Sequence, residues 1–154
     1  MPTPRPTIAE DLPGILALIG EVFAEYGCVL DAEHEDTYLL SPGPHFRESG
    51  GEFWVVEQAG KIVATAAVLL HDDDAELKCL YVHRSSRRRG WGRRLSELCM
   101  DFARRAGKRR MILWSDTRFI EAHQLYQQMG FTQRGTRELH DSNNTTEYGY
   151  ETPL

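Results

Sequence analysis

The sequence predicts one layered domain of the α/β or α+β class. Segments with strand character alternate with segments of helical periodicity, and the middle of the chain has the order strand, turn, helix, strand. The chain has 154 residues, 41% apolar and 27% charged, which suits one globular unit with a sizeable core. We therefore treat residues 1–154 as a single domain.

The first half of the chain predicts two helices and three strands. "RPTIAED" is a short strand that leads into a helix, and "EDLPGILALIGEVFAEYG" has apolar residues at helical spacing up to Gly27. Residues 28–50 are irregular and acidic, with a short helix expected around Glu33–Leu40 that "SPGP" should end. "GEFWVVEQAGKIVATAAVLL" predicts a hairpin, because two β-rich runs flank "QAGK".

The second half predicts four strands and two helices. "HDDD" is a turn and "AELKCLYVH" a strand, followed by a helix over 90–106 with one apolar stripe. "RRMILWS" is the next strand, and "FIEAHQLYQQMG" is a helix that ends at Gly130. "FTQRGTRELH" and "TTEYGYETPL" are closing strands around an "HDSNN" turn.

Charge is distributed unevenly along the chain. Residues 84–110 hold 11 of the 18 basic residues and only two acidic ones, a net of +9, whereas the remainder is −14. A basic centre on an acidic body favours a compact polyanionic ligand over nucleic acid, which usually requires a basic domain.

Several classes of protein are disfavoured by the composition. No apolar run approaches the roughly 20 residues that span a bilayer, and the N-terminus lacks the apolar core of a signal peptide. Three widely spaced cysteines favour a reduced, cytoplasmic protein. The six histidines lack metal-ligand spacing, so we expect no metal.

The segment "RRRGWG" follows a strand and opens a helix, where free amides and the helix dipole attract anions. Gly90 and Gly92 leave the backbone open, and arginine offers forked donors to phosphate. The Walker and dinucleotide-binding fingerprints are both absent. This turn alone is compatible with three interpretations: a phosphate site, a solvated helix face and a nucleic-acid patch.

Three motifs in order resemble the GNAT superfamily of acyl-CoA N-acyltransferases. Arg87–Gly92 fits Q/R-x-x-G-x-G/A, "AELKCLYV" is similar to the fourth strand, and "AHQLYQQMGF" is similar to A-x-x-L-Y-x-x-x-G-F. The resemblance implies a mixed, splayed sheet of about seven strands flanked by about four helices. It places acetyl-CoA between the fourth and fifth strands. The implied cofactor-binding residues are Leu80, Tyr81, Val82, Arg87, Arg88, Arg89, Gly90, Trp91, Gly92, Arg93 and Tyr126.

The resemblance also implies an N-acetyltransferase in which a primary amine attacks acetyl-CoA directly. The Leu80 amide would stabilise the oxyanion, and Tyr126 would protonate the leaving thiolate. Glu76 is a candidate base acting through water, since it lies about 13 Å from Leu80 along the strand. It could instead be a solvated partner of Lys78, and His123 is the other candidate base.

Strand alternation makes two further predictions about this region. Glu76, Lys78, Leu80 and Val82 should share one face, and Cys79 should lie on the opposite face as a small buried hydrophobe. An acyl-cysteine intermediate is therefore disfavoured. Where many superfamily members have an asparagine that holds the cofactor, this sequence has Phe119.

The acceptor should lie under residues 26–50, which cap that site in the superfamily. Tyr26, Glu33, Glu35 and Asp36 are the candidate substrate-binding residues, and the charge of the three acids favours a cationic small-molecule or peptide amine. A homodimer is compatible with the sequence. The main alternative function is an acyl-CoA-binding regulatory or interaction module without turnover, and a nucleic-acid binder built on residues 84–110 is the third.

Overall fold

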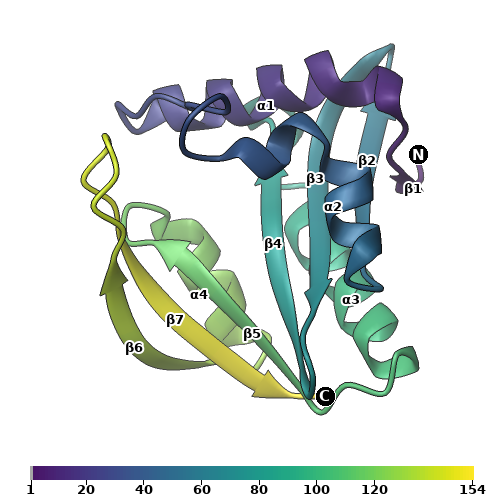
Figure 1. Cartoon of the computed structure of the whole chain (residues 1–154), viewed down its shortest axis with the longest axis vertical. Helices are drawn as coiled ribbons and strands as arrows, with labels where there is room; N and C mark the ends of the chain where they lie inside the picture. Colours follow the sequence, from purple (N-terminus) through teal and green to yellow (C-terminus); the bar gives the residue numbers. More distant parts are fainter. Residues whose placement is uncertain (1) are drawn as a thin grey trace.

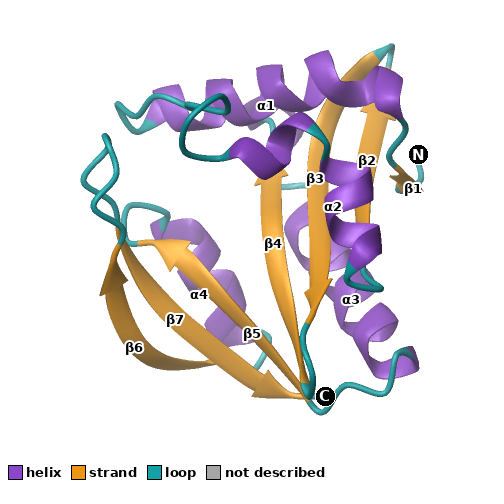
Figure 2. Ribbon diagram, viewed as in Figure 1, coloured by secondary structure: helices purple, strands orange, loops and turns teal. Residues whose placement is uncertain are grey.

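The structure is a computed structural model that describes residues 2–154. Its core is one seven-stranded sheet in the order β1-β2-β3-β4-β5-β7-β6 with four α-helices (Figures 1 and 2). The strands are β1 (Arg5–Pro6), β2 (Glu52–Gln58), β3 (Lys61–Leu70), β4 (Asp74–Val82), β5 (Arg110–Asp116), β6 (Thr132–Glu138) and β7 (Thr146–Pro153). The helices are α1 (Leu12–Glu25), α2 (Pro42–Glu48), α3 (Trp91–Arg105) and α4 (Ile120–Gln128). The predicted fold class is confirmed.

Helices cover both faces of the sheet and form two hydrophobic cores. Helices α1 and α2 pack on one face, where Ile15, Phe46 and Phe53 are fully buried. Helices α3 and α4 cover the other face, where Leu95 and Met111 are fully buried (Figure 1). The apolar stripe predicted for α3 is the side of that helix that faces the sheet.

Strands β4 and β5 are parallel neighbours that pair over only three positions. Asp74 pairs with Arg110, Ala75 with Met111 and Glu76 with Ile112, and the strands then diverge (Figure 1). All the other strand pairs are antiparallel. The rest of β4 therefore borders a gap that opens towards the C-terminal ends of both strands.

The predicted β2–β3 hairpin is confirmed, whereas the prediction that "SPGP" ends a helix is wrong. These residues begin a helix instead of ending one: Ser41 is the N-cap of α2, and Pro42 is its first residue. Proline suits this position, because the first turn needs no backbone donor and its fixed φ is already helical. The preceding predicted helix is a 3₁₀ turn over Thr37–Leu40, labelled η2.

A bulge in β4 changes which side chains share a face. Ala67 pairs with Lys78, but Thr65 pairs with Tyr81, so Cys79 and Leu80 together oppose one residue of β3. Cys79 has a φ of 55°, in the left-handed region that is uncommon for residues other than glycine. One extra residue shifts the alternation of every side chain that follows it.

The predicted common face of Glu76, Lys78, Leu80 and Val82 is therefore wrong. Leu80 and Val82 pack with the core under α3, whereas Lys78 lies over the Tyr38 ring on the α1 and α2 side. Cys79 belongs to the core on that same side, so its predicted position opposite Glu76 is also wrong. Regular alternation cannot anticipate a bulge.

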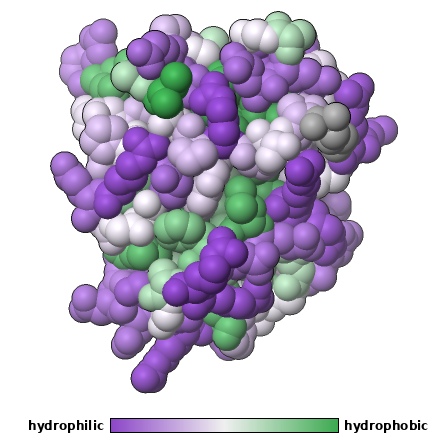
Figure 3. Space-filling view, turned by 90° about the vertical axis from the view of Figure 1, so that its right-hand side faces the viewer, coloured by the Kyte–Doolittle hydropathy of each residue, from purple (hydrophilic) through white to green (hydrophobic). Residues whose placement is uncertain are grey.

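One face of the molecule is mostly hydrophilic (Figure 3). On the face to the right in Figure 1, hydrophilic side chains surround a small central zone of apolar and intermediate residues (Figure 3). Among residues 2–154, no helix is both long and apolar enough to cross a membrane.

Candidate active site

The gap between β4 and β5 contains two adjoining recesses. One, the acceptor-side recess, has a volume of about 250 Å³ and lies between β4, β5, β7 and the loop before η2. The other, the helix-side recess, has a volume of about 380 Å³ and lies between β4, α4 and the start of α3. Leu80, Tyr81, Phe119 and Ala122 line both, so the two recesses adjoin, and we call them together the cleft.

The start of α3 forms one end of the cleft, where its first amides are free of intrahelical partners. Its N-cap is Gly90, with a φ of 81°, and among the described residues no side chain caps it. A Cβ at Gly90 would meet open space, whereas one at Gly92 would lie 3.0 Å from Leu125. Gly90 therefore allows the positive φ of the turn and leaves the amides accessible, while Gly92 lets α3 approach α4.

The arginines of this turn have different roles. The Arg87 guanidinium donates to both oxygens of Glu25 at 2.7 and 2.9 Å and to the Val82 carbonyl at 3.0 Å. Hydrogen bonding to Glu25 raises the pKa of Arg87. This side chain therefore ties the turn to α1. Arg88 and Arg93 are exposed and line the helix-side recess, whereas Arg89 is exposed outside it.

Tyr126 lies in the wall of the acceptor-side recess, to which Leu80 also contributes. Its side chain is 5% exposed, and its ring packs 5.6 Å from that of Phe131 and 5.7 Å from that of Tyr150. Burial raises the pKa of Tyr126 above the ordinary range of tyrosine. The phenol is therefore protonated at neutral pH and can act as a proton donor.

Only one of the two candidate bases reaches the cleft. Glu76 lines the acceptor-side recess, with His71 at 2.9 Å and the Lys78 ammonium at 4.0 Å. His123 is buried, and its Nε2 lies 3.1 Å from Ser115 Oγ. Burial lowers the pKa of His123, and it lines neither recess.

Cys79 lines the acceptor-side recess but has no activating environment. Burial raises the pKa of its thiol to about 11, and Sγ lies 3.7 Å from the Tyr38 hydroxyl. A thiol that stays protonated is a poor nucleophile. The structure therefore changes the predicted face of Cys79 and leaves the expectation of no acyl-cysteine in place.

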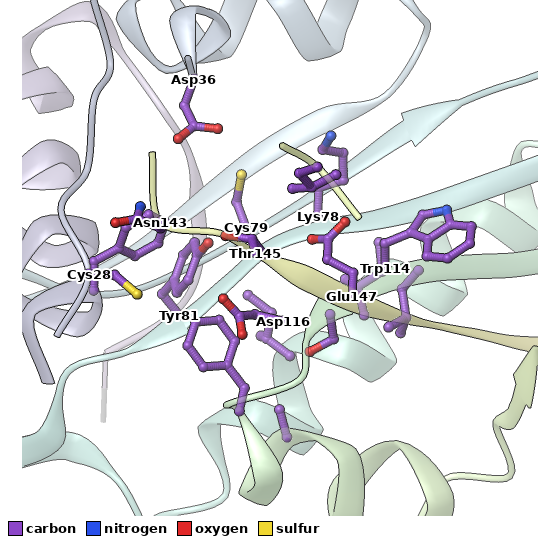
Figure 4. Close-up of a pocket in the computed structure, with 18 of the residues that line it drawn as sticks. Cys28, Asp36, Lys78, Cys79, Tyr81, Trp114, Asp116, Asn143, Thr145 and Glu147 are labelled. Carbon is purple, nitrogen blue, oxygen red and sulfur yellow. The ribbon is translucent and has the colours of Figure 1, made fainter. Parts of the chain in front are cut away.

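Carboxylates dominate the charge of the acceptor-side recess. Five acidic and two basic side chains line it, and Figure 4 shows Asp36, Asp116 and Glu147 among them. Glu147 pairs with Arg137 at 2.8 Å and Asp116 with Arg118 at 3.2 Å. In the described part of the chain, Asp36 has no ion-pair partner, and burial raises its pKa. A cationic guest would fit this environment better than an anionic one.

Two loops meet across the mouth of the acceptor-side recess. The Asn143 side chain, between β6 and β7, accepts from the Val29 amide at 3.0 Å and donates to the Val29 carbonyl at 2.8 Å. Glu35 accepts from the Ser142 amide at 3.3 Å. Arg118, on a third segment between β5 and α4, donates to the Asn143 carbonyl at 2.5 Å. We call this set of contacts the mouth bridge.

The predicted acceptor residues are divided by the structure. Asp36 lines the acceptor-side recess, and Glu35 belongs to the mouth bridge. Glu33 is exposed outside both recesses. Tyr26 lines the helix-side recess, where its ring packs 4.8 Å from that of Phe119.

Sequence reasoning missed the acidic and aromatic residues that β5 and β7 contribute. Trp114 and Asp116 line the recess from β5, and Glu147 joins them because β7 pairs with β5, which sets Glu147 opposite Asp116. No local pattern marks them, since their common location depends on strand order. Among the described residues, no group of three or more His, Cys, Asp or Glu side chains could hold a metal ion.

A splayed sheet with a free helix N-terminus beside the gap is the architecture expected of an acyl-CoA-dependent transferase. The model of the acetyltransferase (GNAT) family matches residues 17–131, and the chain belongs to this family. It is therefore an acetyl-CoA-dependent acyltransferase, as the motifs predict.

Relatives and solved structures agree with this assignment. An uncharacterized N-acetyltransferase of Escherichia coli is 29% identical over 84% of this chain and 81% of its own. Human N-acetyltransferase 8 is 34% identical over a match that covers 59% of this chain and 43% of that protein. A Sinorhizobium meliloti phosphinothricin acetyltransferase, solved in complex with acetyl-CoA, has 17% identity and a TM-score of 0.76, covering 99% of this chain and 88% of that one. At that identity the structural match concerns the fold alone.

Proposed function

We propose that the protein transfers an acetyl group from acetyl-CoA to a cationic primary amine by direct attack. The observation that carries this proposal is the pair of adjoining recesses. One lies at the free amides of the start of α3, the other is acidic, and Leu80 lines both. A diphosphate suits the first end, and an ammonium group suits the second.

The donor would lie along the unpaired part of β4. Its diphosphate would bind the amides of residues 88–93, and exposed Arg88 and Arg93 would offer further donors. Its pantetheine amides would pair with the backbone of Leu80, Tyr81 and Val82. The aromatic ring of Phe119 occupies the position of the superfamily's asparagine, so we expect packing there in place of a hydrogen bond.

The reaction requires a neutral amine, a stabilised oxyanion and a protonated leaving group. The amine nitrogen would form the new bond to the acetyl carbon, and the Leu80 amide would donate to the oxyanion. As the carbon–sulfur bond breaks, Tyr126 would give its proton to the thiolate, and the positively charged nitrogen of the adduct would lose one proton to leave the amide. The Tyr126 phenolate would then regain a proton from water. Glu76, acting through water, is the base we propose, because His123 does not reach the cleft.

Three aspects of the setting are predictions: the acceptor, the compartment and the oligomeric state. We expect a small-molecule or exposed peptide amine as acceptor, because Asp36 and its neighbours supply negative charge while the mouth bridge limits access. We also expect action in the cytoplasm, and the three free thiols agree with a reduced compartment. A homodimer stays compatible with the chain.

The experiment is a screen of amines by thiol release from acetyl-CoA. The panel should contain amino acids, polyamines, aminoglycosides and peptides, and mass spectrometry should identify the acetylated product. Turnover of a cationic amine supports the proposal. Tight binding of acetyl-CoA without thiol release across the panel would favour a regulatory module without turnover.

A further inference from the structure

We propose that Thr65 is a positioning residue that aims the Leu80 amide into the cleft. This inference rests on the proposed function, because it concerns the group that would bind the acetyl oxygen. Thr65 lies on β3, lines neither recess and is fully buried. It is the one polar residue within the otherwise apolar run "IVATAAVLL".

The Thr65 hydroxyl makes a hydrogen bond at the bulge of β4. Its Oγ1 donates to the Cys79 carbonyl at a distance of 2.7 Å. Regular pairing between β3 and β4 is interrupted between Thr65 and Ala67, which is where β4 carries its extra residue. The side chain thus supplies a cross-strand bond at a point where the ladder is irregular.

The geometry of the peptide group connects this bond to the cleft. The Cys79 carbonyl and the Leu80 amide belong to one planar, trans peptide unit, in which C=O and N–H point in opposite directions. Thr65 holds the carbonyl towards β3. The Leu80 N–H must therefore point away from β3, to the side of β4 on which the strand diverges from β5.

The bond also matters because the local backbone is unusual. Cys79 has a φ of 55°, which a residue with a Cβ rarely adopts unless its surroundings enforce it. Without the hydroxyl, the buried carbonyl would lose its partner, and the peptide unit would be free to rotate towards another one. The Leu80 amide would then lose its fixed direction while the rest of the cleft remained.

The test compares binding of acetyl-CoA with binding of CoA, which lacks the acetyl oxygen. Calorimetry should be run on the parent, Thr65→Val, Thr65→Ser and the control Thr7→Val. Thr7 is buried at the far edge of the sheet, and its hydroxyl donates to Asp11 at 3.0 Å, so the control also deletes a buried hydroxyl bond.

We expect Thr65→Val to lower acetyl-CoA affinity relative to CoA affinity by about three- to tenfold, the usual value of one neutral hydrogen bond. Thr65→Ser keeps the donor and should retain the parent ratio, and so should Thr7→Val. An unchanged ratio in folded Thr65→Val would overturn the inference. Failure of the parent to bind either ligand would instead refute the proposed function.

A second measurement needs no variant. In the ¹⁵N-labelled parent, the Leu80 amide resonance should shift more on saturation with acetyl-CoA than with CoA, because only acetyl-CoA supplies an acceptor there. Equal shifts for the two ligands would show that this amide does not face the acetyl oxygen. Once an acceptor amine is known, Thr65→Val should reduce kcat by about 10- to 100-fold with little change in the KM of the amine, below the full value of an oxyanion donor.

Discussion

Replacing Tyr126 by phenylalanine tests the assignment of the general acid with little disturbance of structure. Tyr126 is buried, its ring packs against Phe131 and Tyr150, and Phe keeps that packing. No described residue makes a hydrogen bond to the hydroxyl, so its removal should change the free energy of unfolding by less than about 1 kcal/mol. Turnover should fall by roughly 10²- to 10⁴-fold, which corresponds to about 3–5 kcal/mol of activation free energy.

The assay is thiol release from acetyl-CoA with the best amine of the panel, followed from pH 6 to 10. Burial raises the pKa of Tyr126 above its ordinary value of about 10, so the parent should show no alkaline loss of rate from this phenol within that range. Acetyl-CoA affinity should barely change. Tyr150→Phe is the matched control, because Tyr150 is also a buried tyrosine in the same core but lines neither recess.

Equal kcat for Tyr126→Phe and the parent across this range would refute the reasoning. The leaving thiolate would then need no acid from the protein, and Tyr126 would be a packing residue. A loss of the same size in Tyr150→Phe would point to disturbed packing of the shared core. Only a loss specific to Tyr126 supports proton donation.

Three further predictions concern the cofactor end of the cleft, its acceptor end and the edge of the sheet. Gly90→Val should weaken acetyl-CoA binding more than tenfold by calorimetry, whereas Gly60→Val, at a similar positive φ in the β2–β3 turn, should not. Asp36→Asn should raise the KM of a cationic amine about three- to tenfold at low salt, and a KM that stays at the parent value would exclude a role for that charge. The Arg5 hydrogen bond holds the pKa of Asp11 below its ordinary value. Asp11 thus stabilises the fold at neutral pH, and that stability is lost as pH falls below about 4. At pH 7 the Asp11→Asn variant should melt at a lower temperature than the parent, but its melting temperature should fall less on acidification. Equal dependence of the melting temperature on pH in both proteins would contradict this linkage.

Most of the fold follows from local patterns in the sequence. Helical spacing predicts α1 and α3, and the glycine in "QAGK" predicts the β2–β3 turn, where Ala59 and Gly60 both have positive φ. The failures have local causes as well. Pro42 occupies a first-turn position that tolerates proline, and Cys79 carries a bulge that no hydrophobic pattern encodes.

The candidate site is only partly legible in the sequence. The turn at Gly90 and the tyrosine at 126 could be predicted, because each belongs to a motif with fixed spacing. Asp116 and Glu147 could not, since they meet only when β7 pairs with β5. The sequence also cannot show that the Arg87 guanidinium is engaged by Glu25 and is therefore not free for phosphate.

The three-residue pairing of β4 with β5 has a consequence for the stability of the unliganded protein. Beyond Glu76 the two halves of the sheet are not joined by strand hydrogen bonds, so a bound donor would act as an extra strand between them. Ligand binding and sheet cohesion are then thermodynamically linked, and at a hundredfold excess over Kd the donor adds about 2.7 kcal/mol of stability. The melting temperature of this protein should therefore rise with the concentration of acetyl-CoA.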